Sequence, residues 1–378
     1  MDTTVLCANL MRIRAQVGLS QAEVAEKAGI SRQGYRSLEA GSSEPRARTL
    51  EAIAAALRVP VEELLRPVRP LKKVRFRADK KMTTRNQVLA DVSRWLEDYC
   101  ELEEQLGEAT GPTLRECPRR SSPEKCAGWA RDQLGLGEGE LIRDICGLLE
   151  DQGVKVYLPR VASEGFFGLS IGRDDGGPAV VVNTWDRISV ERWIFSAAHE
   201  LGHLLLHLDA YDVTVEKEDE QQEKEADRFA SHFLMPAPVF REEWEEARGR
   251  PLVDRVFKLK QIFRVSYKTV LYRVAEETND KQIWGKFYAQ YKRRTGRALA
   301  KTDEPGAMTL ADFRRSPAPT AKGSEEPERV KASAFMDDRL WRLVRQAVES
   351  GEISMSRGAE ILRLSTREMR EVSAGWVG

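Results

Sequence analysis

The chain has 378 residues, which is enough for two or three domains. Its 60 basic and 60 acidic residues give a formal net charge of zero, which argues against indiscriminate nucleic-acid binding and restricts any DNA contact to a local patch. The sequence has no apolar run long enough to cross a membrane and no signal peptide, and its five scattered cysteines lack a Cys-x-x-Cys pair, so we expect a cytoplasmic protein without disulfides.

The first predicted domain, residues 1–67, is a bundle of five short helices. Two of them, residues 20–29 and 31–41, each begin at a serine able to cap a helix and end at a glycine suited to the left-handed conformation. Ser20 and Glu23 have the spacing of a capping box. A leading helix and two closing helices are expected over residues 10–16, 49–57 and 61–65.

This pattern is similar to the XRE/Cro type of helix-turn-helix domain, in which the second helix enters the DNA major groove. The resemblance implies that Gln21 contacts DNA at the start of the first helix. Tyr35 stands where a small aliphatic residue is usual, so the helix is expected to dock at a slightly different angle. The alternative is a bundle that only dimerises or binds another protein. The residues expected at base edges and phosphates are Arg32, Gln33, Arg36 and Ser37.

Residues 68–119 are predicted to form a basic linker followed by an amphipathic helix. The segment 66–81 is rich in Lys and Arg and is broken by proline, which suits either a linker that follows phosphates or a solvated segment. Residues 86–106 carry apolar side chains at helical spacing. We expect this helix to pack against the next domain or against a second subunit of a homodimer.

A metal-binding domain is predicted over residues 120–280. It begins with three short runs rich in β-branched residues, bounded by Gly, Pro and Asp, which predict a small antiparallel sheet. Ahead of them, Cys117 and Cys126 flank a loop rich in Pro, Arg and Ser. Either thiol is a candidate to cap the metal as a thiolate, and the alternative is an ordinary free cysteine. The three runs are residues 153–157, 165–171 and 178–183.

The next helix carries the pattern His199-Glu200-Leu201-Gly202-His203, which is the H-E-x-x-H arrangement of a zinc peptidase. Side chains four residues apart share one face of a helix, so both imidazoles can bind one metal ion. Glu200 then lies close enough to act as general base toward the attacking water. A chance occurrence in a charged helix is the alternative, which the scarcity of histidine disfavours. His207, on the same stripe, is expected to be a core or helix-end residue.

Zinc needs a third ligand, and the acidic helix predicted over residues 218–236 supplies candidates. We assign Glu223 to the metal and Asp227, one turn later, to orienting His199 or His203 by a hydrogen bond. Glu225 is the second choice for the ligand. His232, on the same helix, either lines the cleft and donates to an oxyanion or is an ordinary packed histidine.

Residues 195–207 and 223–236 together resemble the ImmA/IrrE family of zinc metallopeptidases, and the likeness covers roughly residues 120–275. It implies bound Zn²⁺, a small sheet ahead of the zinc helix, and an edge strand that holds substrate backbone in extended form. Members are cytoplasmic regulators that typically cleave a repressor of the helix-turn-helix kind. Asp227 departs from the pattern, because many members carry Asn there.

The remaining chain is predicted to be helical and partly extended. Residues 252–274 suggest two helices joined at a serine cap, and residues 281–332 a helix followed by a flexible tether. Residues 333–378 suggest a small module with helices over 337–349 and 356–372. This module faintly resembles a short antitoxin-type helix-turn-helix, and a dimerisation or partner-docking hairpin is an equal alternative.

The predicted fold class is therefore α+β and mostly helical: a five-helix DNA-binding bundle, a zincin-like peptidase domain and a C-terminal helical module. The expected function is that of a zinc-dependent endopeptidase and transcriptional regulator, which cleaves a repressor to relieve repression in a stress, phage or mobile-element response. The alternative is a transcription factor whose peptidase-like domain acts mainly as a sensor of a ligand or partner.

Overall fold

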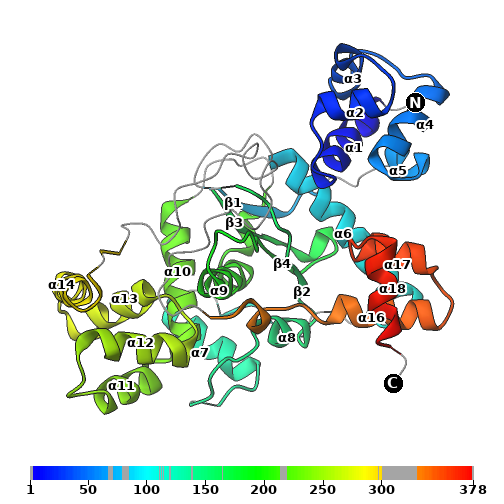
Figure 1. Ribbon diagram of the computed structural model, residues 1–378. Helices are drawn as coiled ribbons and strands as arrows, with labels where there is room; N and C mark the ends of the chain where they lie inside the picture. The colour runs from blue at the N-terminus through cyan, green and yellow to red at the C-terminus, as the bar shows by residue number, and fades with distance from the viewer. Residues whose placement is uncertain are drawn as a thin grey trace. The chain divides into compact units, whose positions relative to one another are not determined.

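The computed structural model divides the chain into two compact units, one made of Met1–Leu71 and Lys81–Tyr99 and the other of Lys72–Lys80 and Cys100–Gly378 (Figure 1). The described residues are 3–66, 71–78, 85–109, 111, 113, 115–118, 121–137, 139–163, 165–212, 219–296, 298–299 and 330–376.

The first unit contains the predicted five-helix bundle, which is confirmed. Ser20 accepts a hydrogen bond from the backbone N–H of Glu23, whose carboxylate accepts from the N–H of Ser20, as the capping box requires. Gly29 takes the left-handed conformation in the turn between the second and third helices, with φ of 66°. The helices are α1 (Thr3–Gln16), α2 (Gln21–Lys27), α3 (Arg32–Glu39), α4 (Ala47–Leu57), α5 (Val61–Leu65) and the first part of α6 (Arg85–Gln105).

The core of this bundle is apolar and includes Tyr35, whose side chain is fully buried. Tyr35 therefore takes up the core position that the sequence pattern assigned to a smaller side chain. Other members of this core include Leu6, Leu10, Val24, Leu38, Leu50 and Ile53.

The second unit is built on a four-stranded sheet with the order β1-β3-β4-β2. β3 pairs in antiparallel fashion with β4, as expected, and also with β1, whereas β2 and β4 are parallel and not antiparallel as predicted. The sheet is mixed because the chain crosses from β2 to β3 without pairing them, and β4 then returns between the two. The strands are β1 (Val74–Ala78), β2 (Lys155–Tyr157), β3 (Phe166–Ile171) and β4 (Ala179–Val182).

β1 corrects one prediction, because it lies within the segment that the sequence indicated to be a basic linker. Val74 and Phe76 are buried and alternate with half-buried Arg75, and Phe76 stacks on Phe166 with ring centroids 5.2 Å apart. The remainder of the predicted linker falls partly outside the described residues.

In the second unit, α8 packs against β2. α9 packs against β3 and β4 and also against α10 (Figure 1). The predicted serine cap is present, since Ser266 accepts from the N–H of Thr269 at the start of α13. The helices are α7 (Pro123–Gln133), α8 (Ile145–Glu150), α9 (Val190–Leu206), α10 (Glu220–Leu234), α11 (Ala237–Glu246), α12 (Leu252–Phe263), α13 (Tyr267–Thr278) and α14 (Ile283–Thr295), with 3-10 turns η1 (Arg173–Asp175) and η2 (Leu208–Ala210).

The C-terminal module consists of η3 (Ala332–Ala334), α16 (Arg339–Glu349), α17 (Met355–Ile361) and α18 (Thr366–Ala374). The single helix predicted over residues 356–372 is thus two helices. Arg363 is left-handed, with φ of 60°, and Ser365 forms a new capping box with Glu368, so the chain stops one helix and starts another. Most of the predicted tether lies outside the described residues.

The pair α17–α18 repeats the local geometry of α2–α3. Both helices of each pair begin at a serine cap, and the two caps are equally spaced in both pairs. The turn is closed by equivalent backbone hydrogen bonds, from Ile30 N–H to the Ala25 carbonyl at 2.9 Å and from Leu364 N–H to the Ala359 carbonyl at 2.8 Å. The faint helix-turn-helix likeness of the C-terminal sequence therefore has a counterpart in its backbone.

Candidate metal centre

α9 places two histidines side by side in the interior of the second unit. The helix starts at the Ser189 cap and buries most of its surface, including the side chains of His199 and His203. Because the two residues are one turn apart, their side chains extend from the same side of the helix, and their Nε2 atoms lie 2.9 Å from each other.

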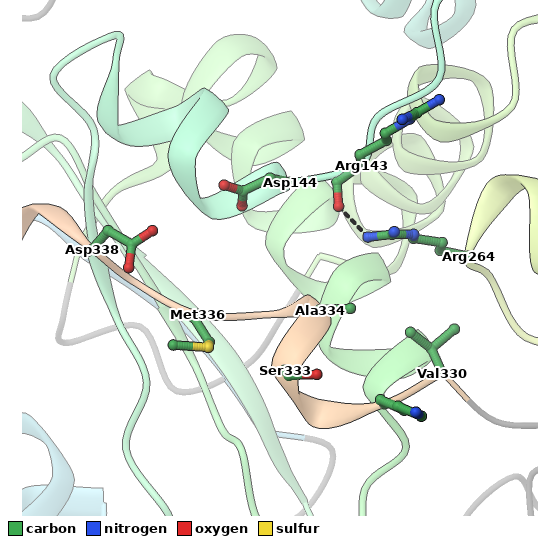
Figure 2. A pocket seen from close by; sticks show the side chains of 9 residues that line it. Arg143, Asp144, Arg264, Val330, Ser333, Ala334, Met336 and Asp338 are labelled. Atoms are coloured by element: carbon green, nitrogen blue, oxygen red, sulfur yellow. Dashed lines mark hydrogen bonds between the residues drawn. The ribbon is translucent and has the colours of Figure 1, made fainter.

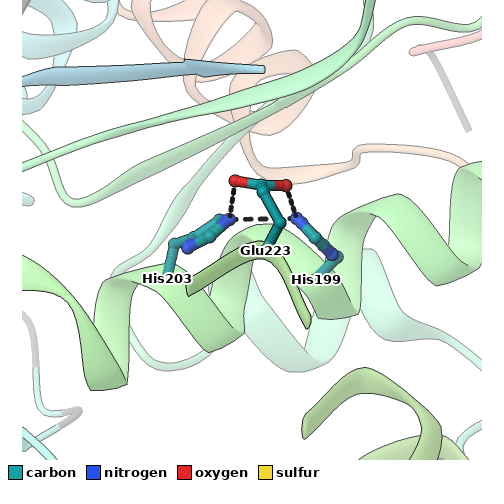
Figure 3. Close-up of side chains that lie close together, drawn as sticks. All are labelled: His199, His203 and Glu223. Atoms are coloured by element: carbon teal, nitrogen blue, oxygen red, sulfur yellow. Dashed lines mark hydrogen bonds and ion pairs between the residues drawn. The ribbon is translucent and has the colours of Figure 1, made fainter. Parts of the chain in front are cut away.

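Glu223 on α10 completes a three-residue cluster with these histidines. Its two carboxylate oxygens lie 3.2 Å from the Nε2 atoms of His199 and His203, respectively (Figure 3). One possible ligand atom from each of the three side chains lies within 4.8 Å of the other two. Gly202 allows this approach, because a Cβ atom there would lie 2.9 Å from the ring of Phe229 on α10.

The Nδ1 atom of each of these two histidines also has a hydrogen-bond partner. Asp227 Oδ1 lies 2.8 Å from His199 Nδ1, and since a carboxylate accepts, Nδ1 carries the proton and Nε2 keeps a lone pair. His203 Nδ1 lies 2.9 Å from Nδ1 of His207. Nε2 of His207 in turn lies 3.0 Å from Glu225 Oε2. Glu225, the second choice for a ligand, thus contacts His207 rather than the three-residue cluster.

Glu200 lies between α9 and strand β3. Its carboxylate accepts a hydrogen bond of 2.8 Å from Ser170 Oγ, which accepts one of 2.7 Å from the hydroxyl of Tyr211. The strand passes close at Gly168, where a Cβ atom would lie 3.0 Å from Glu200 Oε1. Burial raises the pKa of Tyr211, which keeps its hydroxyl protonated as a donor.

A cation from outside the predicted site also reaches the cluster. Arg75 on β1 forms an ion pair of 3.0 Å with Glu223 Oε1 and donates a second hydrogen bond to the side chain of Gln222. Ser170, Tyr211 and Arg75 escaped sequence analysis because only the folded sheet brings them to α9.

The charge states of the cluster side chains suit a bound cation. Burial lowers the pKa of His203 well below its ordinary value, with His199 and Arg75 acting in the same direction against Glu223, so the ring is neutral at pH 7. Arg75, 3.0 Å from Glu223 Oε1, favours the ionised form of this carboxylate.

Two other candidates lie away from this cluster. His232 contacts Arg273 and Glu276, and burial followed by Arg273 lowers its pKa to about 4. Cys117 and Cys126 are buried in the core of the second unit, and burial and then Cys117 raise the pKa of Cys126, which disfavours a thiolate there.

A second group of possible metal-binding side chains contains Glu124, His232 and Glu276. Arg228 pairs with both carboxylates, and Arg273 pairs with Glu276. These two arginines already balance the negative charge, so the group is an ion-pair network.

A surface pocket of about 530 Å³ lies elsewhere in the second unit, and none of the three cluster residues lines it. Figure 2 shows the segment around Ser333, Ala334 and Met336 along one side, with Arg264 donating to the backbone carbonyl of Arg143 opposite. The mixed lining offers no convergent set of catalytic groups.

The five residues predicted to contact DNA lie on α2 and α3 of the first unit. Arg32, Gln33 and Arg36 are exposed on α3, and Ser37 is half-buried on the same helix. Gln21 is half-buried, and its amide donates to Glu39. Three of the five side chains are therefore exposed on α3.

Comparison with known proteins confirms the two resemblances. Residues 149–275 match the family profile of the IrrE N-terminal-like domain, and residues 10–64 match the helix-turn-helix profile. The first match includes β2, β3, β4, α9 and α10 but not β1.

No curated protein matches the chain. Among solved structures, a transcriptional regulator from Mycobacterium tuberculosis is similar over 48% of this chain and 52% of that one, at 16% identity and a TM-score of 0.29. The chain thus spans about half the length of that structure. Among the described residues, no helix is long and apolar enough to cross a membrane.

Proposed function

Because the chain joins a helix-turn-helix domain to an IrrE N-terminal-like domain, we propose that it is a zinc-dependent endopeptidase that also binds DNA and regulates transcription. The observation that carries this proposal is the convergence of His199, His203 and Glu223 beside the carboxylate of Glu200.

The donor atoms of the cluster suit zinc. Two imidazole nitrogens and a carboxylate oxygen are a frequent ligand set of catalytic zinc, which leaves a fourth position open. With the protons on Nδ1 of both rings, the lone pairs of His199 Nε2 and His203 Nε2 face the carboxylate of Glu223. A cation bound between these three groups would offset their mutual repulsion. Asp227 and the His207–Glu225 pair would orient the two rings.

Zinc held there would act as a Lewis acid toward a water molecule and the scissile carbonyl. Glu200 would take the proton from the attacking water and pass it to the leaving amine. Ser170, itself held by Tyr211, would fix the carboxylate of Glu200 in the orientation that this transfer needs.

We propose that the substrate is a protein, a repressor of the helix-turn-helix kind, and that cleavage relieves repression in the cytoplasm. The DNA partner would be an operator read by α3, through Arg32, Gln33, Arg36 and Ser37, with Gln21 at the start of α2. A homodimer would present two such helices to the two halves of an operator.

Metal content provides the test. The purified wild-type protein should contain one zinc per chain, Glu223→Ala should lose it, and Glu225→Ala should retain it. Absence of zinc from the wild type, or its loss only with Glu225→Ala, would contradict the site. If Glu200→Gln left the transcriptional response intact in cells, the domain would be a sensor of a ligand or partner and not an enzyme.

A further inference from the structure

The strand β1 comes from outside the domain that holds the metal cluster. β2, β3 and β4 all lie within the matched residues 149–275, whereas β1 covers Val74–Ala78. In the order β1-β3-β4-β2, removal of β1 would leave β3 as the sheet edge. β3 is also the strand that contacts Glu200.

The pairing of β1 with β3 passes directly beside the proposed catalytic centre. Arg75 is paired with Ser170, which donates to Glu200, and Arg77 is paired with Gly168, whose backbone approaches the same carboxylate. Any extended chain in this register therefore runs past Glu200. An unpaired strand edge is also a general template for the backbone of an extended peptide.

Arg75 extends from this strand to the metal cluster. Its side chain is largely buried, at 10% exposure, and the guanidinium binds the carboxylate of Glu223 and the amide oxygen of Gln222. The cluster of His199, His203 and Glu223 thus receives a basic side chain from the residue paired with Ser170.

From this juxtaposition we infer that the edge of β3 is a binding site for an extended peptide with a basic residue at the position paired with Ser170, and that residues 72–78 of the chain fill this site as an internal inhibitor. The inference rests on the proposed function and adds its regulation. A substrate must displace β1 before its backbone can pair with β3.

Contacts with β3 and with Asp175 hold β1 in place. Phe76 stacks on Phe166, and the carboxylate of Asp175 accepts from the backbone N–H groups of Lys72 and Lys73. Five residues pair with β3, and the register shifts between Arg77 and Ala78. The side chains of Lys72 and Lys73 are exposed, so they offer control positions on the same segment.

The test measures peptide binding rather than turnover. A labelled peptide with the sequence of residues 71–80 is titrated by fluorescence anisotropy into zinc-loaded full-length protein carrying Glu200→Gln, which prevents cleavage. Phe76→Asp is added to release β1, and Lys72→Ala serves as the matched control. We expect the peptide to bind about tenfold or more tightly to the Phe76→Asp protein than to the parent or the control. Equal affinity in all three proteins, or no binding to any, would overturn the inference.

Two further measurements distinguish release of β1 from misfolding of the variant. The zinc content of the Phe76→Asp protein shows whether the metal site is intact. If zinc is lost, the Arg75→Ala variant is used in place of Phe76→Asp in the same comparison. Hydrogen exchange on the protein without β1 substitutions should show faster exchange in residues 74–78, and unchanged protection of β3, when the peptide is added in excess. Unchanged exchange of residues 74–78 at saturating peptide would also overturn the inference.

The same proteins with Glu200 restored separate this inference from the proposed function. If the peptide binds as expected but none of the zinc-loaded proteins cleaves it, the result would contradict the proposed peptidase activity. It would still support the inference that β1 occupies the edge of β3. Cleavage at the same rate with and without Phe76→Asp would support the peptidase and contradict inhibition by β1.

Discussion

Glu200 depends on a hydrogen bond from the sheet for its orientation. Ser170 is buried and donates to Glu200 at 2.8 Å, while Tyr211 donates to Ser170, so each hydroxyl has one acceptor and the direction of the chain is fixed. A general base has to be aligned with the proton it takes, and a donor on its other oxygen favours the ionised form. Ser170 is therefore a positioning residue in the proposed mechanism.

Ser170→Ala should lower kcat/KM on the order of tenfold while zinc content is unchanged, as is typical for loss of a supporting hydrogen bond. It should also move the acidic limb of the pH–rate profile toward higher pH, because the ionised carboxylate of Glu200 loses a hydrogen-bond donor. Tyr211→Phe, which leaves Ser170 in place, should have the smaller effect. An unchanged pH profile in Ser170→Ala would argue that the serine serves packing alone.

At the scale of elements, the metal cluster depends on how closely α9 and α10 approach. Gly202 lies on α9 between the two histidine positions of the motif, and no side chain separates it from Phe229. A methyl group at this position overlaps the aromatic ring and moves α10, together with Glu223, away from the histidines.

Gly202→Ala is therefore expected to destabilise the protein by about 1–3 kcal/mol and to weaken zinc retention, despite the better helix propensity of alanine. Gly128→Ala is the matched control, since Gly128 also lies within a helix, α7, but a Cβ atom there meets nothing within 4 Å. That variant should be neutral or slightly stabilised. Thermal unfolding and zinc content of the two variants provide the comparison, and equal behaviour would refute the steric argument.

Elements with local signals were predictable from the sequence. Serine caps, a capping box and a turn glycine defined α2 and α3, and the spacing of His199 and His203 placed both on one face of α9 before the fold was known. Glu223 was a candidate because it stands one turn before Asp227 on an acidic helix. The structure brings these residues together.

Features that depend on tertiary pairing were not predictable in the same way. β1 has only five residues in a basic segment, and its partner β3 begins about ninety positions later, so neither composition nor local periodicity indicated a strand. The parallel pairing of β2 with β4 and the contact of Ser170 with Glu200 follow from strand order, which the sequence of one chain does not contain.

At the scale of the molecule, buried hydrogen bonds and ion pairs connect the C-terminal module to the rest of the second unit. The carboxylate of Glu150 accepts hydrogen bonds from the backbone N–H groups of Asp338 and Arg339. Arg339 also pairs with Glu103, which pairs with Lys155. Burial raises the pKa of Glu150 to about 7, against these two backbone hydrogen bonds, which act to lower it.

This raised pKa predicts a pH-dependent contribution to stability. Between the ordinary pKa of a glutamate, about 4.3, and about 7, the folded chain holds a proton that the unfolded chain has lost, so the contribution of Glu150 falls as pH rises. Glu150→Gln is neutral throughout. The Tm of this variant relative to wild type should therefore increase between about pH 5 and about pH 8 in calorimetry. A Tm difference that stays constant over this range would contradict the assignment.

The two activities proposed for this chain should be separable, because each unit has its own apolar core and its own candidate residues. Arg32 and Gln33 lie exposed on α3 in the first unit, while the metal cluster is buried in the second. A base contact contributes about 1–3 kcal/mol of discrimination. Arg32→Ala combined with Gln33→Ala should thus weaken operator binding about tenfold or more and leave zinc content unchanged.

Glu200→Gln should do the reverse, abolishing cleavage without altering operator affinity. Arg293→Ala removes an exposed arginine from α14 and controls for the loss of one positive charge. Gel-shift titration at a fixed salt concentration, beside zinc analysis of the same preparations, measures both properties. If the substitutions on α3 left DNA affinity unchanged, the N-terminal bundle would be a protein-binding module, and the proposed repressor substrate would be the first partner to test for it.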